Sequence, residues 1–247
     1  MAIFYQQIQK TSNTDPLEVT FNSLSTPDPV VLISPVWLHQ NNHVGYIETV
    51  VQGSISQTGC KIVSNNSAPE NYYVSVVAID SGMTKYGALN ITEGAIAKTD
   101  TQEDIDFTNP LTNPDPVGIL TPTWSGPVGY IETQISAAAS EMTITSANHA
   151  PSGYFVQYAA ADRGRVIGPN GILETGSVNK GQFRVRVYFS SPFASLPVVV
   201  VSPWWDKQPN GVGYIETITK ITLNYFEIVS GNSGENYFVN WMALSPK

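Results

Sequence analysis

The six-residue stretch Val44-Gly45-Tyr46-Ile47-Glu48-Thr49 occurs twice more in the chain, as residues 128–133 and 212–217. The copies are evenly spaced, because 84 positions separate Tyr46 from Tyr130 and again Tyr130 from Tyr214. An identical string at a constant period indicates an internal repeat in which each copy marks one structural unit.

The sequence on both sides of each copy repeats as well. Upstream lies an apolar run that starts with proline and ends with tryptophan, at 29–37, 116–124 and 197–205. Downstream lies a Tyr-aromatic-Val step, which begins at Tyr72, Tyr154 and Tyr237. We therefore divide the chain into three segments, residues 1–80, 81–162 and 163–247, with boundaries in polar, glycine-containing stretches.

These segments have the pattern of β-strands. Residues 183–189, Phe-Arg-Val-Arg-Val-Tyr-Phe, alternate between apolar and polar, which is typical of a strand with one buried face. We expect each Val-rich run to be a central strand closed by its proline, and Gly-Tyr-Ile-Glu-Thr to open the next strand. Strands every ~10 residues with turn signals between them predict an all-β fold of three tandem antiparallel β-sandwich units.

Each unit has only about 80 residues and therefore a small core, so we expect the units to share interfaces. The linkers are short and partly apolar, as in residues 168–173. This favours a compact cluster with pseudo-threefold symmetry over a row of separate units.

The composition of the 247 residues excludes several classes of function. The net charge is −8 and the few cations are scattered, whereas nucleic-acid binding requires a clustered basic surface. No apolar run approaches the roughly 18 residues of a membrane span. No signal peptide is visible at the start, so we expect a cytoplasmic protein, one released by a non-classical route, or part of an extracellular particle. The single cysteine, Cys60, cannot form an intrachain disulfide.

Catalysis finds little support in the motifs. The chain lacks nucleophile-elbow, zinc-protease, phosphate-loop and EF-hand patterns, so we expect no enzyme, no cofactor and no metal. His39 and His43 are four residues apart but lie in a predicted loop of one segment only. The strongest patterns occur three times, which fits multivalent binding or structural symmetry better than one catalytic site.

The repeated glutamates allow three interpretations. On a strand, Tyr46 and Glu48 lie on one face and Ile47 on the other, and an aromatic ring beside a carboxylate suits a sugar. Alternatively, each glutamate accepts hydrogen bonds from the backbone or a tyrosine hydroxyl at an interface, because a buried carboxylate needs partners. A third arrangement is a ring of glutamates around a pseudo-threefold axis, which would raise their pKa values or recruit a cation.

Four tryptophans follow shortly after the prolines, and polar loops come next. A tryptophan beside Asp, Asn or Gln is a plausible sugar platform, although each tryptophan could instead pack against the strand end. The middle loop is three residues shorter, so a site there should differ or be absent. The candidate ligand-binding residues are Trp37, His39, Asn42, Tyr46, Glu48, Trp124, Tyr130, Glu132, Trp204, Trp205, Asp206, Asn210, Tyr214 and Glu216.

The third segment also carries a family pattern. Phe189-Ser190-Ser191-Pro192-Phe193 precedes the Val-rich run after Pro197, and Trp241-Met242-Ala243 lies near the end. This pattern resembles the H-type lectin domain, over roughly 65 residues of each segment. The resemblance implies six-stranded antiparallel sandwiches that assemble as trimers and bind galactose or N-acetylgalactosamine at subunit edges, here with three protomers fused. The family's third-strand arginine has no counterpart, and of its Trp-His pair only His149 is similar.

Three hypotheses for function follow. The first is a carbohydrate-binding, lectin-like protein with up to three similar sites, which recognises cell-surface glycans or glycoproteins by avidity and without catalysis. The second is a structural or assembly subunit, such as a phage or particle surface component, in a higher homo-oligomer. The third is the target-recognition part of a toxin.

Overall fold

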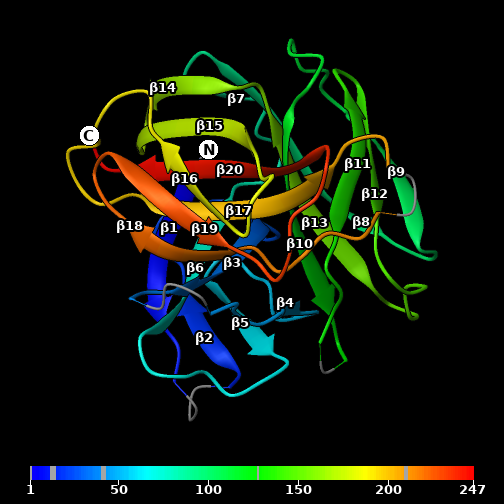
Figure 1. The fold of residues 1–247 in the computed structure, drawn as a ribbon. Coiled ribbons are helices and arrows are strands. Elements are labelled where there is room, and N and C mark those ends of the chain that lie inside the picture. The colour runs from blue at the N-terminus through cyan, green and yellow to red at the C-terminus, as the bar shows by residue number, and fades with distance from the viewer. Residues whose placement is uncertain (1, 12–14, 40–42, 127, 209–210) are drawn as a thin grey trace.

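The computed structural model describes residues 2–11, 15–39, 43–126, 128–208 and 211–247. These residues form 20 strands in three sheets and no helix, which confirms the predicted all-β class (Figure 1). Each sheet has six or seven strands.

Six strands follow one another in the same order in each segment, and the second and third segments begin with one additional strand, β7 and β14. The first segment holds β1 (Ile3–Gln9), β2 (Leu17–Thr20), β3 (Val30–Trp37), β4 (Glu48–Val51), β5 (Gly59–Ser64) and β6 (Tyr72–Ile79). The second holds β7 (Lys85–Tyr86), β8 (Leu89–Ala97), β9 (Gln102–Asp106), β10 (Val117–Trp124), β11 (Thr133–Ala138), β12 (Glu141–Thr145) and β13 (Phe155–Ala161). The third holds β14 (Gly164–Gly168), β15 (Gly171–Asn179), β16 (Arg184–Tyr188), β17 (Val198–Trp205), β18 (Thr217–Ile221), β19 (Tyr225–Val229) and β20 (Tyr237–Ser245).

Every sheet combines strands of two segments. The strand orders are β1-β6-β3-β18-β19-β16, β2-β5-β4-β10-β13-β8-β7 and β14-β15-β20-β17-β11-β12-β9. Pairing within a segment is antiparallel, and the sheets cross from one segment to the next through the parallel pairs β3–β18, β4–β10 and β11–β17. The segments therefore share three continuous sheets in a cyclic arrangement.

The central strands continue through their prolines, which corrects the expectation that proline closes them. On β3, the N–H groups of Val31 and Ile33 point away from β6 and donate to Gln157 Oε1 (3.1 Å) and Thr121 Oγ1 (3.0 Å) of the second segment. Pro35 lies two residues after Ile33, so its backbone nitrogen also points away from β6. The missing N–H of the proline therefore removes no hydrogen bond between β3 and β6. The equivalent strands run through Pro122 and Pro203.

Glycine and threonine of the repeated motif bond the segments to one another. Gly45 N donates to Thr217 Oγ1 (2.6 Å), Gly129 N to Thr49 Oγ1 (2.7 Å), and Gly213 N to Thr133 Oγ1 (2.7 Å). Each bond joins two different segments, so the three bonds close a ring. The strands start only at the glutamate or threonine of the motif, so the Gly-Tyr-Ile part is irregular rather than the predicted strand opening.

The apolar core has one shared part and three local parts. A central cluster combines all three segments, for example through Leu32, Ile119 and Val200. β3, β10 and β17, which carry these residues, lie together near the middle of the molecule in Figure 1. Three further clusters fill mainly one segment each. This shared core explains how three small units reach adequate burial.

Candidate functional site

Each repeated glutamate lies in a buried network with lysine, serine and tyrosine. Glu48 Oε2 is 3.1 Å from Lys10 Nζ, and Glu48 Oε1 accepts hydrogen bonds from Ser64 Oγ (2.7 Å) and Tyr72 OH (2.8 Å). The second segment repeats this with Glu132, Lys98, Ser146 and Tyr154. The carboxylates thus accept hydrogen bonds from tyrosine hydroxyls, as the structural interpretation expects, but their partners lie in the same segment and not across an interface between segments.

The three glutamates also surround a small cavity on the pseudo-threefold axis. This cavity is about 70 Å3, and Ile47, Ile131 and Ile215 line it together with the glutamates. The volume is that of about two water molecules. It is too small for a sugar ring, so the repeated Tyr-Ile-Glu does not form a sugar cleft there.

The third network differs from the other two. Lys180 Nζ lies 3.8 Å from Glu216 Oε2 and donates instead to Ser230 Oγ and to the carbonyl oxygen of Phe183 (2.9 Å). Glu216 Oε1 still accepts from Tyr237 OH (2.7 Å), but its buried Oε2 has no hydrogen-bond partner among the described residues. Burial raises the pKa of Glu216 to about 7, and the more distant lysine offsets part of this effect.

Between pH 5 and pH 8, the free energy of unfolding of the wild-type chain should fall by about 2–3 kcal/mol more than that of Glu216→Gln. The pKa of Glu216 in the folded chain is raised, so its protonated form stabilises the fold. This stabilisation is complete below the unfolded-state pKa of roughly 4.3 and is lost as pH rises through about 7. Urea unfolding at both pH values measures the difference.

Glu132→Gln is the matched control for this experiment. Glu132 Oε2 is 2.7 Å from Lys98 Nζ, so the substitution removes the partner of a buried cation and should lower stability at both pH values. If the free energy of unfolding changed equally with pH in the wild type and in Glu216→Gln, the raised pKa of Glu216 would be contradicted.

Three of the candidate tryptophans pack on the tyrosines of these networks. The ring centroids of Trp37 and Tyr72 are 5.9 Å apart, and Tyr46 lies 5.3 Å from Tyr72. Tyr46 N also donates to Tyr72 OH (3.1 Å). Equivalent clusters contain Trp124, Tyr130 and Tyr154, and Trp205, Tyr214 and Tyr237. These tryptophans therefore cover the strand ends, which is the packing alternative stated for them.

Trp204 is placed differently from its neighbour Trp205. It lies next to Phe238 on the paired strand β20, with ring centroids 4.9 Å apart, and the guanidinium of Arg163 lies 5.7 Å from its ring. Asp206, half-buried, lines the same cleft. Of the candidate residues, Trp204 and Asp206 therefore lie together in a cleft that is large enough for a ligand.

The other candidate loop residues do not join them. His39 is exposed in a turn with positive φ (67°). Asn42 and Asn210 lie outside the described residues. His149, the residue similar to the lectin family pattern, is exposed and lies 2.9 Å from Asp100 through Nδ1.

The cleft that contains Trp204 lies between the second and third segments, and we call it the 2–3 cleft. Its volume is about 540 Å3, and it is lined by Asp115, Ser136, Arg163, Trp204, Asp206, Lys207 and Phe238, with Ala137 completing the wall. Arg163 Nε donates to the carbonyl oxygen of Asp115 (3.0 Å), which ties the two segments together at the rim.

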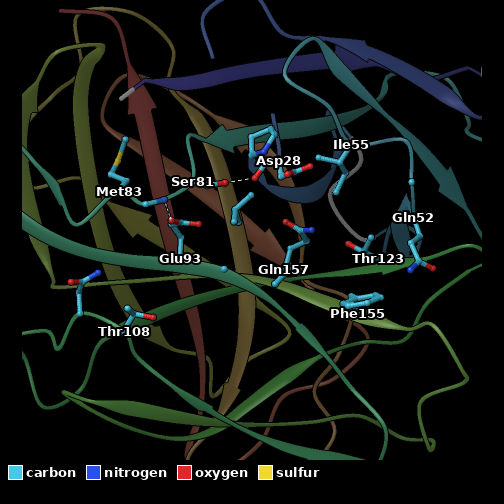
Figure 2. A pocket seen from close by; sticks show the side chains of 17 residues that line it. Asp28, Gln52, Ile55, Ser81, Met83, Glu93, Thr108, Thr123, Phe155 and Gln157 are labelled. Carbon is cyan, nitrogen blue, oxygen red and sulfur yellow. Dashed lines mark hydrogen bonds between the residues drawn. The ribbon is translucent and has the colours of Figure 1, made fainter. Parts of the chain in front are cut away.

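A second cleft occupies the equivalent place between the first and second segments, and we call it the 1–2 cleft (Figure 2). Its volume is about 560 Å3. The strand registers make Thr123 and Phe155 the counterparts of Trp204 and Phe238, since both are cross-strand pairs at the same position. Similarly, Asp28, Gln52 and Ser81 correspond to Asp115, Ser136 and Arg163.

The third junction, between the third and first segments, has a more apolar set of residues. Leu196 occupies the position in the third segment that Asp28 and Asp115 occupy in the first and second. Val36 occupies the position in the first segment that Trp204 occupies in the third. Leu38 stands where Asp206 stands in the third segment, and it packs with Val36 in the apolar cluster of that junction. The repeat is therefore symmetric in its backbone but not in the chemistry of its junctions.

Several residues of these sites escaped the sequence interpretation. Lys10, Lys98 and Lys180 were missed because lysine is rarely buried. Phe155 and Phe238 belong to the repeated Tyr-aromatic-Val step, and strand alternation places the second aromatic on the face opposite the buried tyrosine. That alternation is the signal that could have located the clefts. Arg163 lies at a segment boundary and gave no such signal.

Comparisons with family models, curated protein sequences and solved structures found no match to the chain. Within the described ranges, no three His, Cys, Asp or Glu side chains lie close enough to hold a metal ion. No helix among the described residues is long and apolar enough to span a membrane.

Proposed function

We propose that the chain is a carbohydrate-binding, lectin-like protein without catalytic activity, and that the 2–3 cleft is its principal site. The observation that carries this proposal is a cleft of about 540 Å3 lined by the half-buried Phe238 and the largely buried Trp204 (7% exposed), beside charged side chains of both signs.

The chemistry of this cleft suits a saccharide. A sugar ring has an apolar face that packs on aromatic rings and hydroxyl groups that both donate and accept hydrogen bonds. Asp206 and Asp115 offer carboxylate acceptors, and Arg163 and Lys207 offer donors. The volume lies within the range of small-molecule sites.

One further observation supports the proposal. The strand pattern of the third segment resembles the H-type lectin domain, whose members bind galactose or N-acetylgalactosamine. Glycans or glycoproteins are therefore the proposed partners.

A glycan array probed with the intact chain tests this function, with Trp204→Phe and Trp205→Phe compared on every glycan that binds. Trp204→Phe should weaken binding about tenfold or more, because the indole is the larger platform. Trp205→Phe should bind like the wild type, since Trp205 packs on Tyr214 and Tyr237 outside the cleft.

Loss of glycan binding in Trp205→Phe with binding kept in Trp204→Phe would contradict binding in the 2–3 cleft. It would favour the site in the tryptophan loop that is expected from the sequence. Asp206→Ala provides a second variant if Trp204→Phe is unstable, because Asp206 is only half-buried. An array without any bound glycan would overturn the proposed function itself.

An assembly subunit is the second candidate, and one observation favours it. Ile167, Tyr188 and Leu196 are 67%, 65% and 63% exposed, and all three lie in the third segment. Large exposed apolar side chains of this kind are typical of protein contacts when they form a patch. A native mass well above that of one chain, independent of concentration, would favour this function.

A further inference from the structure

The 1–2 cleft is a candidate site whose chemistry differs from that of the 2–3 cleft. Figure 2 shows Glu93 and Gln157 rising from neighbouring strands, with Ser81 near Glu93 and bonded through its Oγ to the carbonyl oxygen of Asp28. β8 and β13, which carry Glu93 and Gln157, are paired in one sheet. The cleft is therefore built on rigid strands of the second segment and closed by loops of the first.

The lining of the 1–2 cleft contains negative but no positive side chains. Its charged residues are Asp28 and Glu93, and no Lys, Arg or His stands among the described residues that line it. At the equivalent positions of the 2–3 cleft, Arg163 stands where Ser81 stands here. Among the described residues, both clefts thus contain the equivalent aspartate, Asp28 or Asp115, whereas only the 2–3 cleft contains the arginine.

Glu93 is held in a fixed position at the side of this cleft. Its Oε1 accepts a hydrogen bond from Gly82 N (2.6 Å), and the side chain is half-buried. Burial raises the pKa of Glu93, because the backbone donors only partly compensate the lost hydration of the carboxylate. A cation beside this carboxylate would restore favourable electrostatic interactions.

The remaining wall is suited to a partly apolar ligand. Phe155 and Ile55, both half-buried, contribute apolar surface, and the amides of Gln52 and Gln157 contribute neutral hydrogen-bonding groups. A compact body packed on the apolar side chains would therefore lie in a cleft whose charged lining residues, Asp28 and Glu93, are both carboxylates.

We propose that the 1–2 cleft binds a small organic amine, with the protonated amino group beside Glu93 and attracted also by the charge of Asp28, and an apolar body against Phe155 and Ile55. This site is separate from the 2–3 cleft, so it does not depend on the proposed carbohydrate function.

Cyclohexylamine and cyclohexanol form a matched pair of probes that differ in the charged group. We would titrate each into the full-length chain at pH 7 with methionine methyl groups labelled for NMR. Met83 is a core residue (3% exposed) that borders the cleft, whereas Met142 and Met242 are core residues that do not line it and serve as internal references. The Met83 signal should shift, and the amine should bind at least about tenfold more tightly than the alcohol.

Two variants locate the charge preference. Glu93→Gln keeps an oxygen acceptor for Gly82 N and should weaken amine binding about tenfold, while Asp28→Asn, at an exposed position, should weaken it as well. Asp115→Asn changes the equivalent aspartate of the 2–3 cleft and should leave amine binding unchanged.

Equal affinity for the amine and the alcohol would overturn the proposal, as would an unshifted Met83 signal. Amine binding that persists in both Glu93→Gln and Asp28→Asn would also overturn it. A glycan array without hits has no bearing on these outcomes, so failure of the carbohydrate function and failure of this site can be told apart.

Discussion

Replacement of Lys98 by methionine should lower the free energy of unfolding by about 3–5 kcal/mol at pH 7. Lys98 Nζ lies 2.7 Å from Glu132 Oε2 and also donates to Ser146 Oγ, and all three side chains are buried. The substitution leaves a buried carboxylate without its cation, which costs more than the intact pair contributes. Urea unfolding followed by circular dichroism measures the change.

Two further variants make this result specific. Lys98→Met combined with Glu132→Gln removes both charges and should recover a large part of the loss. Lys85→Met replaces an exposed lysine and should change stability by less than about 0.5 kcal/mol. A Lys98→Met chain as stable as Lys85→Met would show that the buried pair is not formed.

Gly129→Ala should destabilise the chain by about 1–3 kcal/mol, because the added methyl group has no space. A Cβ at Gly129 would lie 2.5 Å from Pro122 Cβ and 3.2 Å from Tyr154 OH. Any shift that relieves this clash also lengthens the bond from Gly129 N to Thr49 Oγ1, which joins two segments. Thermal or urea unfolding measures the effect.

Gly231→Ala is the matched control, since nothing lies within 4 Å of a Cβ at that position. It should be close to neutral. If both alanine variants had the same stability, the close contact between the repeated motif and the central proline would be refuted.

Much of the fold follows from the sequence because its causes are local. Alternation of apolar and polar residues marks strands such as β16, and the repeat of Gly-Tyr-Ile-Glu-Thr indicates three related units. The expectation that proline ends the central strands was wrong because a proline removes a hydrogen-bond donor on only one side of its strand. Whether the neighbouring strand pairs on that side depends on how the segments pack, which the local sequence does not show.

The candidate site was less predictable for a similar reason. Glu48 and Lys10 are 38 residues apart, and their pairing depends on how the start of β4 meets the end of β1, a strand of a different sheet. The tryptophan loops repeat strongly in the sequence, yet three of the four tryptophans pack on tyrosines. The clefts arise where segments meet, so their lining combines residues that no single repeat contains, such as Arg163 with Trp204.

A crystal structure of the intact chain grown with galactose or N-acetylgalactosamine tests the central claim most directly. The account predicts a sugar ring in the 2–3 cleft, stacked on Trp204 or Phe238, with hydroxyl groups bonded to Asp206 or Arg163. A sugar bound instead beside Trp37 or Trp205, or an empty 2–3 cleft at saturating sugar, would contradict it.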